Sequence, residues 1–340
     1  MPKLISQRGS TICRVCNSKN LKSVLDLGAQ PLPAEYGRNK DEILDEFPLH
    51  LKICKNCGLG QLGEYVLPER IFHKEYPYLS SASTTWIKHA ENYAEKMIQH
   101  LKLNKKSLVI ELASNDGYLL SQFKGLEIPV LGIEPAANVA LIAEKKGIKT
   151  IVDFFGVKLA KKVLKEYGYP SLIAANNVYA HIPDMHDFTE GMSLLCNEDT
   201  IITIENPSFA NLIKGSLFDT IYHEHYSYLS AHSVREIAKA HKLNLFHIDQ
   251  LNTHGGSNRY WLSKNKKEDE SIKKILEQEL EAGILNENEW FRFSERAKSS
   301  IEGLKEWLLE KEKNGAQIVG YGAAHKGNTF LNAVGVSSKI

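Results

Sequence analysis

Short apolar runs alternate with helix-forming stretches through the middle of the chain. The runs occupy residues 108–112, 130–134, 171–177, 200–205 and 244–250. Strands separated by helices predict a parallel sheet that is covered by helices on both faces. Residues 106–248 are therefore expected to form a Rossmann-like α/β domain.

The segments on either side of this domain follow other patterns. Residues 66–105 form a bridge, in which Trp86, Tyr93 and Met97 recur at helical spacing and predict a helix over about 85–101. Residues 268–313 are rich in Glu and Lys with interspersed apolar residues, which predicts long solvated helices. A second strand-and-glycine pattern begins at 316–322, and the chain stops after one such unit. Residues 249–340 are therefore expected to be an incomplete C-terminal α/β domain.

The N-terminal region, residues 1–65, contains two C-x-x-C pairs, Cys13 with Cys16 and Cys54 with Cys57. Two such knuckles bring four thiolates into a tetrahedron around zinc, and four cysteine ligands leave no open position for a catalytic water. Disulfides and a redox C-x-x-C are the weighed alternatives. We expect a small domain with a structural zinc ion, crossed by a Pro-containing loop at 26–36.

The turn after the first apolar run has the features of a cofactor site. It lacks the G-x-G-x-x-G glycines that place a pyrophosphate on a helix N-terminus, and it has an acidic residue at the end of each flanking strand. S-adenosylmethionine (SAM) has no phosphate and carries a cationic ammonium and sulfonium, so it suits this turn better than a nicotinamide cofactor does. A nicotinamide site and a cofactor-free α/β core remain alternatives. The residues expected at the SAM site are Glu111, Ala113, Asn115, Gly117 and Glu134, with Glu134 on the ribose hydroxyls.

A second candidate site is the aromatic and titratable cluster at residues 218–230. It contains Tyr222, His223, Glu224 and His225, and a similar group with Asn177 and His181 follows the run at 171–177. The spacing is not that of an H-E-x-x-H metal site. A polar surface turn and a proton-transfer site next to a substrate carbonyl both remain open, since a histidine with Tyr and Glu neighbours suits the latter.

These motifs together resemble a known family. The chain is similar, over essentially its whole length, to the sugar C-methyltransferases that act on nucleotide-linked 4-keto-deoxysugars. The resemblance is carried, in this order, by CRVC and CKNC, YPYLSSAS, ELASNDGYLL, GIEP, NNVYAHIPD, YHEHYSYLS, THGGSNRYW and GYGAAHKGNTFLN. It implies zinc-binding, SAM-binding and C-terminal α/β domains, a TDP-sugar substrate, methylation of the carbon beside the ketone (C3), and a chain that ends inside its last domain.

The resemblance also implies residue roles. His225 corresponds to the general base that removes the proton beside the keto carbon, with Tyr222, Glu224 and His181 as supporting residues. Tyr76 corresponds to an aromatic residue near the sugar carbonyl. Ser81 in YPYLSSAS and Asn177 in NNVYAHIPD are assigned to the cofactor site.

The composition restricts the classes of binding partner that are expected for the protein. The chain of 340 residues has 42 Lys and Arg against 41 Asp and Glu, a net charge of +1, without the basic excess typical of nucleic-acid binders. No apolar run is long enough to span a bilayer, and no signal peptide is visible, so a cytoplasmic enzyme with no membrane partner is expected. A monomer is compatible with the sequence, which does not fix the oligomeric state. The rival functions are an O- or N-methyltransferase of another small molecule, a zinc-ribbon RNA methyltransferase, and a non-catalytic sugar-binding or scaffold protein.

Overall fold

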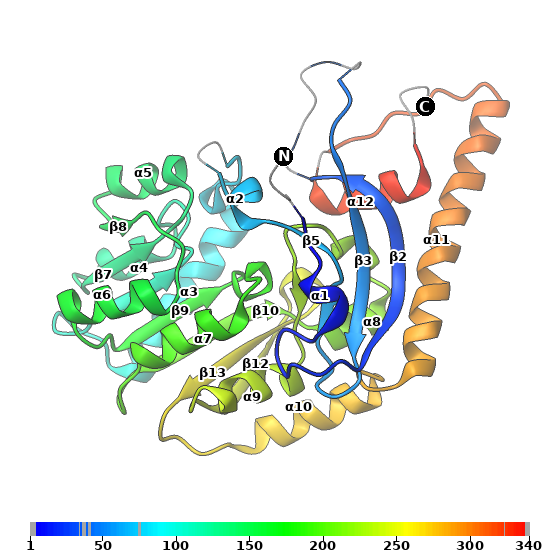
Figure 1. The fold of residues 1–340 in the computed structure, drawn as a ribbon. Coiled ribbons are helices and arrows are strands. Elements are labelled where there is room, and N and C mark those ends of the chain that lie inside the picture. The colour runs from blue at the N-terminus through cyan, green and yellow to red at the C-terminus, as the bar shows by residue number, and fades with distance from the viewer. Residues whose placement is uncertain are drawn as a thin grey trace.

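The computed structural model describes residues 5–33, 35, 39, 42–73, 76–322 and 324–336. Its largest element is a seven-stranded sheet in the order β12-β13-β10-β9-β6-β7-β8 (Figure 1). The strands are β6 (Val109–Leu112), β7 (Val130–Ile133), β8 (Thr150–Ile151), β9 (Leu172–Asn176), β10 (Ile201–Pro207), β12 (Asn244–Leu251) and β13 (Ser257–Ser263). Strands β8, β7, β6, β9 and β10 pair in parallel, whereas β13 pairs antiparallel with both β10 and β12.

Helices cover both faces of this sheet, so its parallel strands are buried on both sides and are near-continuous apolar runs. These helices are α3 (Thr84–Leu101), α4 (Leu120–Lys124), α5 (Ala137–Lys145), α6 (Val157–Tyr167), α7 (Met185–Leu194) and α9 (Ala231–Ala240), whereas the buried residues of α8 (Phe209–Gly215) pack with those of the N-terminal sheet. Helix α3 begins where Ser83 caps it, the Ser83 hydroxyl accepting a hydrogen bond from the Trp86 amide at 3.3 Å. Its buried stripe, Ala90, Tyr93, Ala94 and Met97, has the i, i+3, i+4, i+7 spacing of an amphipathic helix.

The N-terminal region forms a second, antiparallel sheet. The elements of this region are β1 (Ile5–Ser6), α1 (Arg8–Thr11), β2 (Leu21–Pro31), β3 (Glu46–Cys54), β4 (Gly60–Leu62), β5 (Tyr65–Val66) and α2 (Pro68–Ile71), of which β1 and β5 pair separately with each other. The order of the larger sheet of this region is β11-β4-β3-β2, and its edge strand β11 (Ser227–Tyr228) comes from the α/β part of the chain. The two sheets are therefore joined by main-chain hydrogen bonds as well as by side-chain packing.

The C-terminal region packs against this N-terminal sheet. Helices α10 (Glu270–Glu281), α11 (Glu287–Lys313) and α12 (His325–Val334) follow one another, and α11 runs along the outer side of β2 (Figure 1). Trp290, Phe293 and Ala297 of α11 share a buried cluster with Leu49 and Leu51 of β3. The long solvated helices predicted for 268–313 are thus present, each with one buried face.

Two local expectations differ from the structure. The Pro-containing segment is not a loop up to Pro31, because β2 continues through it with irregular pairing, and Gly28 at φ 75° accommodates the irregularity. Residues 316–322 form no strand, because none of the described strands pairs with them. The Rossmann-like α/β class and the five predicted strands are confirmed. Among the described residues, every helix is too short or too polar to cross a bilayer.

Candidate functional site

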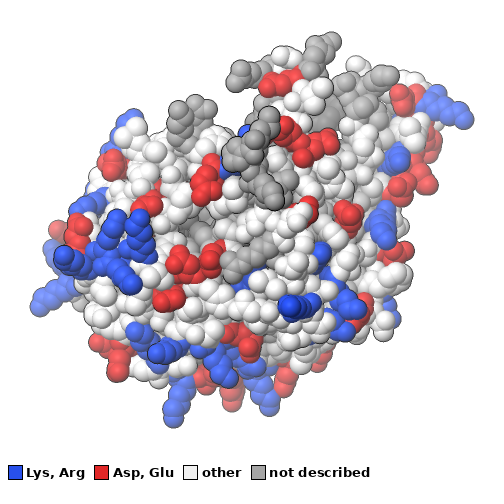
Figure 2. All heavy atoms as spheres, viewed as in Figure 1, with Lys and Arg blue, Asp and Glu red and all other residues white. Residues whose placement is uncertain are grey.

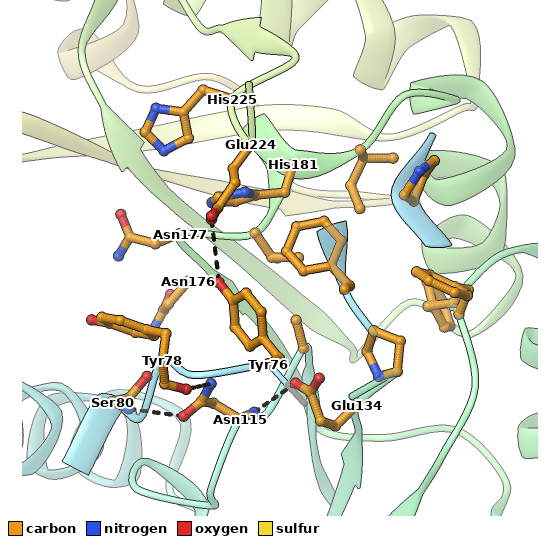
Figure 3. A pocket seen from close by; sticks show the side chains of 18 of the residues that line it. Tyr76, Tyr78, Ser80, Asn115, Glu134, Asn176, Asn177, His181, Glu224 and His225 are labelled. Atoms are coloured by element: carbon orange, nitrogen blue, oxygen red, sulfur yellow. Dashed lines mark hydrogen bonds between the residues drawn. The ribbon is translucent and has the colours of Figure 1, made fainter. Parts of the chain in front are cut away.

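A cavity of about 600 Å³ opens at the carboxyl edge of the parallel strands, where ligands bind in open α/β sheets. Its walls come from residues 68–86, from the ends of β6, β7, β8 and β9, from the loop at 220–225 and from the first residues of α12. Figure 3 shows Glu134 and Asn115 on one side of this space, with Glu224, His181 and His225 on the other. The two candidate sites predicted separately from the sequence therefore lie in one cavity.

The turn after β6 is held in an unusual backbone conformation. Ala113 and Asn115 adopt φ of 54° and 49°, the left-handed region that non-glycine residues seldom occupy. The Asn115 side chain accepts a hydrogen bond from the Ser80 amide at 2.8 Å and donates one to the Tyr78 carbonyl at 3.2 Å. These bonds fix segment 78–80 over the turn (Figure 3).

Glu134 stands at the end of β7, on the cavity wall. Its carboxylate accepts hydrogen bonds from the amides of Asn115 at 3.0 Å and Ala136 at 2.7 Å. Burial raises the pKa of Glu134, although these two amide bonds act in the opposite direction. Each carboxylate oxygen keeps a further acceptor position for a ligand hydroxyl.

Three other predicted cofactor residues do not line the cavity. Glu111 is buried beneath the turn, where burial, and then the nearby Glu134 charge, raise its pKa well above the usual range. Gly117 has φ 76°, and a Cβ there would come within 2.5 Å of Ile148, so this glycine serves the packing of the turn. The Ser81 hydroxyl donates a hydrogen bond to Asp116. These residues shape the turn from behind its ligand-facing surface.

His225 is presented to the cavity by a tight turn, in which its amide donates to the Tyr222 carbonyl at 2.9 Å. Its Nδ1 lies 3.0 Å from the Thr220 carbonyl, which can only accept, so Nδ1 carries the proton. Nε2 then carries the lone pair that can accept a proton, and this atom lies 3.0 Å from the Tyr222 hydroxyl. Burial, reinforced by His181, lowers the pKa of His225 well below its usual value. The ring is therefore a neutral acceptor.

Glu224 forms a second pair, with Tyr76. The Tyr76 hydroxyl donates to one carboxylate oxygen at 3.2 Å (Figure 3). His325 Nδ1 lies 3.7 Å from the other oxygen. Burial raises the pKa of Glu224 to about 7, while the bond from Tyr76 opposes this rise. The group can therefore exchange a proton near neutral pH.

His181 lies beside this pair of groups, with its ring centroid 4.8 Å from that of His225. Burial lowers the pKa of His181 to about 4. Several buried polar atoms of cavity residues have no hydrogen-bond partner among the described residues: His181 Nδ1, Asn176 Oδ1, Asn177 Nδ2 and Glu224 Oε1. Because unpaired buried polar atoms are costly, this set indicates a wall built to be satisfied by a polar ligand.

His223 points away from the cavity. Its Nε2 lies 3.0 Å from the Phe47 carbonyl in β3, and its ring packs edge-on against Phe47. The turn at 222–225 thus directs the two histidines to different places, which the spacing alone left undecided.

The four knuckle cysteines converge. Their sulfur atoms lie within 4.8 Å of one another, with 3.5 Å between Cys13 and Cys57 and between Cys16 and Cys54. All four offer thiolates and three of them are buried, which is the donor set of a closed structural zinc site. The N-terminal sheet is too small to form a large core alone, so metal binding contributes to its folding.

Some cavity residues were not singled out from the sequence. Asp153 follows β8, Trp86 and Tyr78 flank the turn, and His254, His325 and Lys326 come from distant segments. The only signal for the last three was their position inside the motifs THGGSNRYW and GYGAAHKGNTFLN.

Comparisons with known proteins agree with this architecture. Residues 13–72 match the family model described as "Putative zinc binding domain", residues 86–248 match a methyltransferase domain, and residues 252–340 match a C-methyltransferase C-terminal domain. C-methyltransferase NovU of Streptomyces niveus is 29% identical over 332 residues, which are 95% of this chain and 78% of that protein.

Solved structures are more distant. The magnesium protoporphyrin IX methyltransferase ChlM of Synechocystis PCC 6803 is 11% identical, with a TM-score of 0.42 over 53% of this chain and 83% of its own. A SAM-dependent methyltransferase from Anabaena variabilis is 13% identical, with a TM-score of 0.41 over 52% of this chain and 84% of its own.

The α/β sheet, the cavity at its strand ends and the methyltransferase-domain match define a SAM-dependent methyltransferase. Zinc-binding, methyltransferase and C-methyltransferase C-terminal models follow one another along residues 13–340. Along these residues the chain is similar to C-methyltransferases with this domain order.

Proposed function

We propose that this enzyme methylates C3 of a nucleotide-linked 4-keto-deoxysugar, with a TDP-sugar as substrate. The observation that carries the proposal is one cavity with a carboxylate suited to a ribose, Glu134, and a neutral histidine acceptor, His225, on opposite sides. Bound SAM supplies an electrophilic methyl group. The protein's part is to bind both molecules, to remove a proton from carbon and to stabilise the resulting enolate.

The proton-transfer roles follow from the hydrogen bonds. The Thr220 carbonyl holds the proton on Nδ1 of His225, so Nε2 accepts the proton from the carbon beside the ketone. Tyr222 now occupies that lone pair and must turn away, or pass a proton on, when substrate binds. The Tyr76 hydroxyl donates to Glu224, and it stabilises the enolate oxygen by donating to it instead. Methyl transfer to the enolate carbon then restores the ketone.

The cofactor assignment uses the other side of the cavity. Glu134 accepts the two ribose hydroxyls, and Ala113, Asn115 and Asn177 border the same space. Gly117 and Ser81 act by holding the turn in place, and Glu111 lies buried beneath it.

A small-molecule substrate also agrees with the surface. Figure 2 shows positive and negative side chains interspersed over the face that it draws, where a nucleic-acid ligand favours a continuous basic stripe.

The test is incubation with methyl-labelled SAM and a panel of TDP-4-keto-deoxysugars, with NMR of the products. Label on C3 supports the proposal, and the matching 4-hydroxy sugars should remain unlabelled because their C3 proton is not acidic. Label on oxygen or nitrogen, or methyl transfer to the 4-hydroxy sugars, would contradict methylation at C3 of a 4-keto sugar.

A further inference from the structure

The loop that carries Tyr222, Glu224 and His225 is attached to the zinc-binding domain among and directly after these cavity-facing residues. Among them, the His223 ring contacts the Phe47 carbonyl. Directly after them, the Tyr226 carbonyl accepts a hydrogen bond from the Leu62 amide at 3.0 Å, and β11 then pairs with β4. The methyltransferase sheet alone does not determine the position of this loop.

Arg14, inside the first zinc knuckle, completes this attachment. Its guanidinium donates one hydrogen bond to the Tyr226 carbonyl and another, of 2.8 Å, to the Leu62 carbonyl. The guanidinium also lies over the Tyr65 ring, 4.6 Å from its centroid. A single side chain from the C-x-x-C turn thus holds the carbonyl of Tyr226, the residue that follows His225.

The charge of Arg14 links these contacts to the metal. Arg14 is buried, and no carboxylate of the described residues forms an ion pair with it. A buried cation without a counter-charge is costly. A zinc ion with four thiolates has a net negative charge, and Arg14 stands between two of the four ligands, Cys13 and Cys16, in the sequence. The filled metal site would therefore supply negative charge in the knuckle that carries Arg14.

We propose that Arg14 is a positioning residue that couples the zinc site to the loop of His225. The filled site fixes the knuckle and balances the buried charge, and Arg14 then holds the Tyr226 carbonyl in place. The catalytic consequence rests on the proposed function, whereas the coupling of metal, Arg14 and loop does not.

The second knuckle supplies a matched control. Lys55 has the same place between Cys54 and Cys57 that Arg14 has between Cys13 and Cys16, but it is half-exposed and pairs with Glu287 of α11. Arg14→Met and Lys55→Met therefore each remove one positive charge from the equivalent sequence position of a knuckle, and only the first change should release the loop.

Hydrogen–deuterium exchange measured by mass spectrometry tests the coupling without any substrate. In Arg14→Met, peptides covering 220–230 should exchange about 10- to 100-fold faster, because a charge-assisted bond is lost, while peptides of β6 and β7 stay unchanged. Lys55→Met should match wild type in both regions. Graded chelation of the wild-type metal should give the Arg14→Met pattern before the sheet opens. Equal exchange in the 220–230 peptides of all three proteins would overturn the proposal.

Turnover provides the second readout. Arg14→Met should lower kcat by about tenfold or more while KM for SAM stays within about twofold, since the loop faces the other side of the cavity. Arg14→Lys, which keeps the charge and one donor, should recover part of both losses. If Arg14→Met does not fold, Arg14→Lys and the chelation series still decide the matter. A wild type that methylates no keto sugar refutes the proposed function and leaves the exchange result standing.

Discussion

Replacing Glu134 by glutamine should weaken SAM binding about a hundredfold while the fold stays intact. The substitution keeps the size and shape of the side chain and removes its charge. In the structure both carboxylate oxygens accept main-chain hydrogen bonds, from Asn115 and Ala136, and both face the cavity where a ribose would add two more. The glutamine amide group keeps one acceptor and turns the other into a donor.

The magnitude follows from these bonds. A hydrogen bond to a charged acceptor contributes about 1.5–3 kcal/mol. Glutamine loses one ribose bond outright and weakens the second, which together cost about 3 kcal/mol, or about two powers of ten in Kd. The NH2 group of the glutamine cannot accept a hydrogen bond, so the main-chain amide of either Asn115 or Ala136 also loses its acceptor. The substitution therefore also weakens the hydrogen bonding of the turn that carries Asn115.

Calorimetric titration of each variant with SAM measures the effect, and Glu111→Gln is the matched control. Glu111 is buried next to Glu134 but does not line the cavity, and burial raises its pKa well above the usual range. Its glutamine variant keeps the size of the side chain and leaves the cavity lining unchanged, so its SAM affinity should stay within about twofold of wild type.

The control also makes a prediction about stability. A carboxyl whose pKa is raised on folding costs stability as pH rises above its unfolded pKa, so the Tm of Glu111→Gln should increasingly exceed that of wild type as the pH rises above about 4.5. Equal losses of SAM affinity in the two variants would refute the ribose assignment.

Three further predictions concern the remaining groups. Metal analysis should find about one zinc per chain, and Cys54→Ser should lose the metal and lower the Tm, whereas metal-free protein of unchanged Tm would argue against the site. His225→Asn should lower kcat by roughly two to four orders of magnitude with SAM affinity retained, and His223→Asn should be milder; equal activity of the two variants would contradict the base assignment. Burial raises the pKa of Glu224 to about 7, so turnover that needs the carboxylate should rise with pH through this value, and Glu224→Gln should flatten that limb of the profile; an unchanged profile would exclude this role.

The local features of the fold could be predicted because local physics determines them. Strands buried on both faces must be apolar throughout, as the runs at β6, β7 and β9 are. The cysteine spacing identified a metal site because two C-x-x-C turns have few other uses in one chain.

Long-range features could not be predicted in this way. The pairing of Ser227 with Gln61 depends on how two sheets pack together, and the sequence of a two-residue strand does not indicate which strand it pairs with. The burial of Glu111 beneath the turn, and the approach of His325 to Glu224, likewise result from tertiary packing. The choice between His223 and His225 required the turn at 222–225, whose geometry the sequence left open.

The pairing of β4 with β11 has a consequence for synthesis of the chain. At roughly 5–20 residues per second, Ser227 leaves the ribosome on the order of ten seconds after Gln61. During this interval β4 is an open edge, and such edges recruit strands from other nascent chains. Early capture of zinc by the already synthesised knuckles would keep this edge ordered until its partner arrives. Metal supply during translation should therefore govern the yield of active enzyme more strongly than metal added after folding.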